Sequence, residues 1–172
     1  MLKQDSHKLL TIIGLGLLTG TIDGIASIIF SYPVSPGQSF RYIASGLFGT
    51  VAFTANYMVF WGVLFHYLIA AAFSATFFLL YPNIKRIIKN KYIIGIAFGL
   101  IIWVVSTFAI LPLSNVPDLK NVPKYPVHLN LTAAVISIAA LSICLGFPIS
   151  LIASRYYRKN AETNTEDLKL IT

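Results

Sequence analysis

The chain is poor in charged residues, and this scarcity excludes most classes of soluble protein. Charged residues make up 11% of its 172 positions, and only six residues are acidic. Soluble globular domains carry roughly 25% charged residues. Hydrophobic residues reach 56%, and the mean hydropathy is +0.76. The composition therefore indicates an integral membrane protein, whose first partner is the lipid bilayer.

The chain also lacks the residue clusters that hold metals or perform nucleophilic catalysis. Its single cysteine, Cys144, has no second cysteine with which to form an intrachain disulfide. The sequence has no phosphate-binding glycine loop, no paired-histidine zinc motif and no nucleophile elbow. His66 is the one histidine within the predicted spans, too few for a two-histidine haem site in one chain. We therefore expect no metal, no cofactor and no catalytic residue.

Long apolar runs separated by basic joints predict an all-α, integral membrane four-helix bundle. The predicted spans are about 9–31, 57–81, 92–113 and 129–154, within a single transmembrane domain over residues 1–160. A polar tail, 161–172, is expected to be frayed. The first apolar run is about 23 residues long, which favours an uncleaved span over a signal peptide.

Residues 42–56 are the hardest segment to assign. The apolar stretch from Tyr42 to Ile84 is too long for one ordinary span and short for two spans and a hairpin. We favour a short interfacial or re-entrant helix after the first span. The competing model has a fifth span here, but it would place the two flanking basic clusters on opposite sides of the membrane.

The distribution of lysine and arginine predicts the orientation. In the four-span topology one side carries ten basic residues and the other side carries three. The ten are Lys3, Lys8, Lys85, Arg86, Lys89, Lys91, Arg155, Arg158, Lys159 and Lys169, and the three are Arg41, Lys120 and Lys124. The positive-inside rule then places both termini in the cytoplasm. Because the basic residues lie in the connections between the predicted spans and near the chain ends, the net charge of +7 does not indicate nucleic-acid binding.

Asp23 is the only acid inside the long apolar stretches. A chargeable group at membrane depth costs about 2.5–3.5 kcal/mol on insertion scales, so such residues usually have a function. A helical rise of about 1.5 Å per residue places Asp23 roughly 21 Å, and His66 roughly 22 Å, from the cytoplasmic side. The hydroxyl side chains expected in or around the same layer are Ser106, Thr107, Ser137 and Ser142.

Several interpretations of this layer stay open. A histidine beside an aspartate can share a proton, as in proton relays, which favours handling of a proton or small solute. The pair can instead simply fasten two helices, as in a structural or accessory subunit. Asp23 can also pair with Arg41 or stay neutral through desolvation. A lipid- or quinone-modifying enzyme comes third, because it needs a lipid-accessible cleft that reaches both residues. A homo-oligomer or another membrane protein is a further candidate partner.

Small residues and one proline predict how the helices pack. Glycines four residues apart allow close helix contact, which we favour over a pore lining. They are Gly16, Gly20 and Gly24 in the first span, and Gly95 and Gly99 in the third. Pro148 is expected to kink the fourth span. Asn56 is expected to cap or anchor the second span at the outer boundary.

Short motifs over roughly residues 19–153 resemble a family of small bacterial membrane proteins. The motifs are Thr21-Ile22-Asp23, Ile43-Ala44-Ser45-Gly46-Leu47-Phe48-Gly49 with Ala52-Phe53, His66, Leu111-Pro112-Leu113-Ser114 with Pro117, and Gly146-Phe147-Pro148-Ile149. Such proteins often carry another histidine before the last motif, where this chain has apolar and serine residues. The resemblance implies a four-helix protein of the bacterial inner membrane, and it brings no activity with it.

Overall fold

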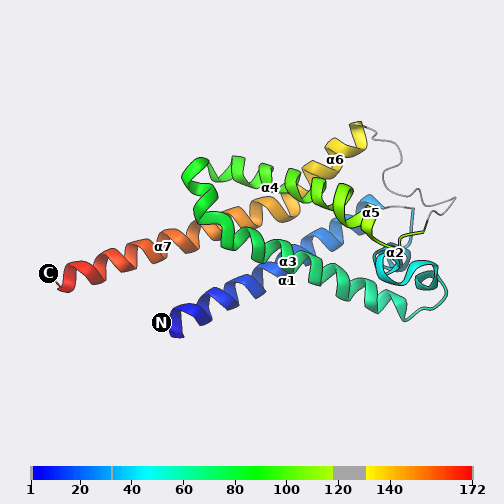
Figure 1. Cartoon of the computed structure of the whole chain (residues 1–172), viewed down its shortest axis with the longest axis horizontal. Coiled ribbons are helices and arrows are strands. Elements are labelled where there is room, and N and C mark those ends of the chain that lie inside the picture. The colour runs from blue at the N-terminus through cyan, green and yellow to red at the C-terminus, as the bar shows by residue number, and fades with distance from the viewer. Residues whose placement is uncertain (1, 32, 118–130, 172) are drawn as a thin grey trace.

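The structure is a computed structural model that describes residues 2–31, 33–117 and 131–171. The described residues form helices and contain no strand. Four helical segments are long and apolar enough to cross a membrane, namely Ser6–Phe30, Met58–Ile87, Lys91–Leu113 and Leu131–Glu162. The predicted all-α four-helix bundle is therefore confirmed (Figure 1). The predicted start of the fourth span, at residue 129, lies outside the described residues.

The helices follow one another with short interruptions. The first half contains α1 (Leu2–Phe30), α2 (Pro36–Phe48), a 3-10 segment η1 (Gly49–Phe53) and α3 (Met58–Ile87). The third span is α4 (Lys91–Val105), a π-helical segment η2 (Ser106–Ile110) and α5 (Leu111–Leu113). The fourth is α6 (Leu131–Leu141), a π-helical segment η3 (Ser142–Gly146) and α7 (Phe147–Ile171).

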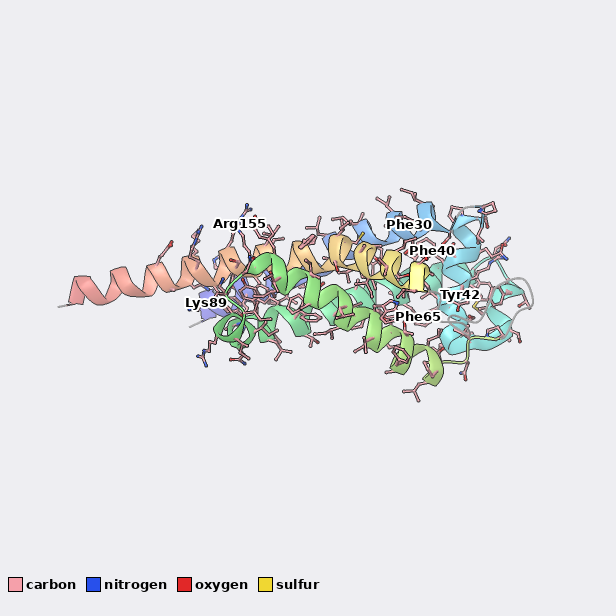
Figure 2. The ribbon with its side chains drawn as sticks, turned by 90° about the horizontal axis from the view of Figure 1, so that it is seen from above. Phe30, Phe40, Tyr42, Phe65, Lys89 and Arg155 are labelled. Atoms are coloured by element: carbon pink, nitrogen blue, oxygen red, sulfur yellow. The ribbon has the colours of Figure 1, made fainter. Side chains whose placement is uncertain are left out.

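Both chain ends lie at the same end of the bundle as the connection between α3 and α4 (Figure 1). The labelled Lys89 and Arg155 lie toward this end, whereas Phe40 and Tyr42 lie at the opposite one (Figure 2). We call these the terminal end and the α2 end. This arrangement is the one that the four-span topology requires. Of the basic residues counted above, Lys120 and Lys124 lie outside the described residues.

The segment after the first span is a short helix. Ser35 caps α2, since its hydroxyl oxygen accepts a hydrogen bond from the Gln38 amide at 3.3 Å, and Pro36 occupies the first turn. Gly49 ends the helix at a positive φ of 59°, a conformation that favours glycine. The 13 residues of α2 span about 20 Å, less than the bilayer core of about 30 Å. The competing five-span model is therefore wrong.

Each of the last two spans contains a π-helical segment that ends two residues before a proline. In both, the amide just before the proline bonds to the carbonyl five residues back, Leu111 to Ser106 and Phe147 to Ser142. Proline lacks an amide hydrogen, so the helix widens where a normal bond is missing. The irregularity expected at Pro148 thus takes the form of a π turn, and Pro112 produces a second one that we did not predict.

The apolar core fills the half of the bundle nearer the terminal end. It is built by fully buried side chains from all four spans, including Leu15, Phe78, Phe98, Ile102 and Ile149. The predicted frayed tail is wrong, because α7 continues as a helix to Ile171. The terminal half of the bundle is therefore tightly packed with apolar side chains.

Candidate functional site

The seam between α1 and α3 is held by three polar bonds. The Nε2 atom of buried His66 lies 2.8 Å from the Gly20 carbonyl oxygen. Because a carbonyl only accepts, the His66 Nε2–H is the donor. The hydroxyls of Thr19 and Ser74 are 2.9 Å apart, as are those of Thr21 and Tyr67. The hydrogen-bond partner of His66 is therefore a backbone carbonyl, and Asp23 interacts with the imidazole only electrostatically, without the direct bond that a shared proton requires.

The first glycine stripe explains how His66 reaches the backbone of α1. A Cβ atom at Gly16 would lie 2.9 Å from Ala71, and one at Gly20 would lie 2.8 Å from the Tyr67 ring. At Gly24 it would lie 3.2 Å from the His66 Nε2 atom. These glycines therefore bring α1 close to α3 and contribute to the seam rather than to a pore lining.

Asp23 lines a cavity of about 800 Å³ in the α2 half of the bundle. All four spans and α2 contribute to its wall, whereas His66 is not part of it. Ser106, Thr107 and Ser137, which we predicted at this depth, do line the cavity. Ser142 does not, because its hydroxyl donates to the Ile138 carbonyl at 2.7 Å. The predicted polar layer is thus divided. Ser106, Thr107 and Ser137 line the cavity with Asp23, His66 lies in the seam between α1 and α3, and Ser142 lies where η3 packs against α4.

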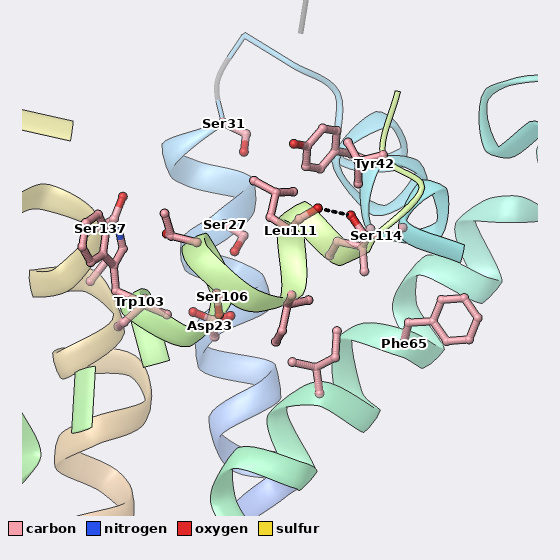
Figure 3. Close-up of a pocket in the computed structure, with 18 of the residues that line it drawn as sticks. Asp23, Ser27, Ser31, Tyr42, Phe65, Trp103, Ser106, Leu111, Ser114 and Ser137 are labelled. Carbon is pink, nitrogen blue, oxygen red and sulfur yellow. Dashed lines mark hydrogen bonds between the residues drawn. The ribbon is translucent and has the colours of Figure 1, made fainter. Parts of the chain in front are cut away.

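One face of α1 presents a column of polar side chains to the cavity. Asp23, Ser27 and Ser31 follow one another at four-residue intervals, and Figure 3 shows them stacked along the helix toward the α2 end. Tyr42 lies toward the upper end of this column in the view of Figure 3, and Ser114 lies at about the height of Ser27. Sequence reasoning missed Ser27 and Ser31, although their spacing from Asp23 is the signal for a shared helix face.

The Asp23 carboxylate interacts electrostatically with His66 but forms no direct bond within the part of the chain that the structure describes. No hydrogen bond or ion pair reaches it there; the salt bridge found is Arg158–Glu162, near the terminal end. Arg41 does not pair with Asp23, because its guanidinium donates to the Asn56 side-chain oxygen. That bond ties α2 to the loop before α3. Asn56 therefore anchors α2 and does not cap α3, whose N-cap residue is Tyr57.

The cavity opens to the lipid-facing surface. Several apolar side chains of its wall are largely exposed, from 50% to 66% of their full accessible area. They are Phe30, Leu47, Leu68 and Ile136. Exposed apolar residues at this level face acyl chains in a bilayer. The cavity wall therefore includes apolar surface that is accessible in the described bundle.

Toward the terminal end, close packing between the third and fourth spans closes the cavity. Gly95 lies against the Phe147 ring, which would be 2.5 Å from an added Cβ atom. Gly99 lies against the backbone of Ser142, and Gly146 against the Gly95 carbonyl. The two predicted glycines thus bring α4 against η3 and α7. None of these three glycines is among the described residues that line the cavity.

Comparison with protein-family models, with curated proteins and with solved structures finds no match to this chain. The function therefore has to be argued from the site itself.

Proposed function

We propose that this is a non-enzymatic bacterial inner-membrane protein that handles a small solute in the pocket around Asp23. The observation that carries the proposal is an unpaired carboxylate in an open cavity of about 800 Å³. This volume lies within the range of about 300–1,000 Å³ typical of small-molecule sites. A group that is costly at membrane depth and forms no direct bond within the described bundle is best explained by a partner that comes from outside.

The alternatives fit less well. A purely structural role accounts for His66, which fastens α3 to α1, but it leaves Asp23 without a purpose. Acid–base catalysis commonly pairs two titratable groups. Among the described lining residues Asp23 has no second acid, histidine, cysteine or lysine beside it. Handling of a solute, by transport or by storage in the membrane, is the function that uses both the carboxylate and the opening.

The test is whether a small solute reaches the column of polar residues. In a Cys144→Ala background, Ser27→Cys is expected to react with N-ethylmaleimide within about tenfold of the rate of the exposed Thr54→Cys. A maleimide needs the thiolate, which forms only where water has access. The matched control is Ser74→Cys, buried in the α1–α3 seam, which should react at least a hundredfold more slowly. Equal slowness at positions 27 and 74 would overturn the proposed function.

The same reaction tests the orientation that we propose, with both termini in the cytoplasm. The connection between α3 and α4 and the adjoining helix ends lie at the terminal end, which supports this orientation. They carry Lys85, Arg86, Lys89 and Lys91. In intact cells, a membrane-impermeant maleimide should label Thr54→Cys, at the α2 end, and leave Ser6→Cys unlabelled until the cells are lysed. Labelling of Ser6→Cys alone in intact cells would reverse the orientation.

A further inference from the structure

We infer that the pocket takes an amphipathic ammonium compound, a cationic amine on an apolar or aromatic body, which enters from the outer half of the bilayer. This inference rests on the proposed function and names the chemical class of its solute. Three independent properties of the wall carry it: the sign of its charge, the polarity of its two sides and the position of its opening.

The charge of the wall selects a cation. Asp23 is the one charged side chain among the described residues that line the pocket, and it forms no ion pair within the described part of the chain. The guanidinium of Arg41, on α2, donates instead to the Asn56 side chain. An ammonium group would donate its N–H bonds to the carboxylate, and in a medium of low dielectric constant such charged pairs are strong. A carboxylate or phosphate ligand would instead meet a like charge and, among the described lining residues, no lysine or arginine.

The polar groups around Asp23 suit a donor-rich headgroup. Ser27 and Ser31 extend the polar column above the carboxylate, and Ser106 of η2 lies close to Asp23 in Figure 3. Thr107 of η2 also lines the pocket. Hydroxyl oxygens accept hydrogen bonds from an ammonium group, which has donors and no acceptor. The headgroup would therefore sit between α1 and the π turn of the third span.

The rest of the wall suits an apolar body. Trp103 and Tyr42 lie on either side of the polar column in Figure 3, and both line the pocket. Aromatic faces attract cations and pack against aromatic or alkyl groups. The exposed lining residues Phe30, Leu68 and Ile136 continue this surface to the lipid side. An amphipathic molecule that is already dissolved in the membrane could therefore enter without crossing a polar barrier.

The experiment compares three probes that share one body: 4-phenylbutylamine, 4-phenylbutanol and 4-phenylbutanoate. The purified full-length protein is placed in nanodiscs of zwitterionic lipid, and the thermal midpoint is titrated with each compound. A ligand that binds only the folded state raises the midpoint with concentration, which gives its apparent Kd. We expect the amine to bind at least tenfold more tightly than the alcohol, and the carboxylate to bind most weakly.

The matched variant is Asp23→Asn, which keeps the shape of the side chain and removes its charge. It should remove the tenfold preference for the amine while leaving the affinity for the alcohol within about twofold. Preference for the alcohol or carboxylate, or no response to any probe, overturns the ammonium assignment. A preference for the amine that Asp23→Asn leaves intact also overturns it. The proposed function fails separately, if Ser27→Cys proves as unreactive as Ser74→Cys.

Discussion

The Gly99→Val variant is expected to lose most of the stability of the bundle. A Cβ atom at position 99 would lie 2.5 Å from the Ser142 amide nitrogen and 2.6 Å from its Cα atom. Both are backbone atoms, so no rotation of a side chain relieves the contact, and α4 would have to move away from η3. Overpacking of this kind costs typically 1–3 kcal/mol and occasionally more. We expect a loss of at least about 3 kcal/mol in the free energy of unfolding.

The matched control is Gly14→Val in α1. Gly14 is exposed, and an added Cβ atom there would meet nothing within 4 Å. Both variants place the same β-branched residue inside a helix, so the difference between them measures the interhelical contact alone. The control should change the free energy of unfolding by less than about 0.5 kcal/mol. Equal stability of the two variants, measured by denaturation in detergent, would contradict the close contact of α4 with η3.

The Asp23→Leu variant is expected to be more stable than the natural protein. The carboxylate is partly buried and forms no direct bond with the described residues, so it is a cost to the folded bundle. Replacing it with an apolar side chain of similar size should raise the free energy of unfolding by about 1 kcal/mol or more. Stability gained in this way commonly removes function, because binding sites keep groups that are costly when unoccupied.

The His66→Leu variant provides the contrast, since it should change stability in the opposite direction. Leucine cannot donate to the Gly20 carbonyl, and the buried seam loses a hydrogen bond and a well-packed ring. Interhelical hydrogen bonds in membranes average about 0.6 kcal/mol and reach about 1.7 kcal/mol. Thermal denaturation of the two variants under the same conditions compares their signs. A destabilised Asp23→Leu protein would show that Asp23 holds the bundle together.

The class of fold and the number of spans could be predicted because both depend on composition and length. A run of about 20 apolar residues must satisfy its backbone within a helix, whatever its neighbours are. The helical extension of α7 to Ile171 and the π turn before Pro112 were not predicted. Each depends on local hydrogen bonding that hydropathy does not describe.

The sequence predicted the membrane depth of the site residues, but it did not predict toward which neighbouring helix Asp23 points. Counting residues placed Asp23 and His66 in one layer, and it placed Ser106 and Thr107 there with them. Successive residues of a helix are separated by about 100°, so Asp23 points about 60° from Gly20 and about 100° from Gly24. The glycines that face α3 therefore turn Asp23 toward another neighbour. Which neighbour it meets depends on how distant segments, such as α1 and η2, come together around the pocket, and this leaves no periodic signal in the sequence.

The central claim is that His66 fastens the bundle while Asp23 lies in a pocket and forms no direct bond with the described residues. A double-mutant cycle with Asp23→Asn and His66→Gln tests it most directly, through the free energy of unfolding of the four proteins. Residues that share no contact give nearly additive effects. We predict a coupling energy below about 0.5 kcal/mol. A coupling energy above about 1 kcal/mol would show that the two side chains act as one pair, and it would contradict the division of the polar layer into a seam and a binding site.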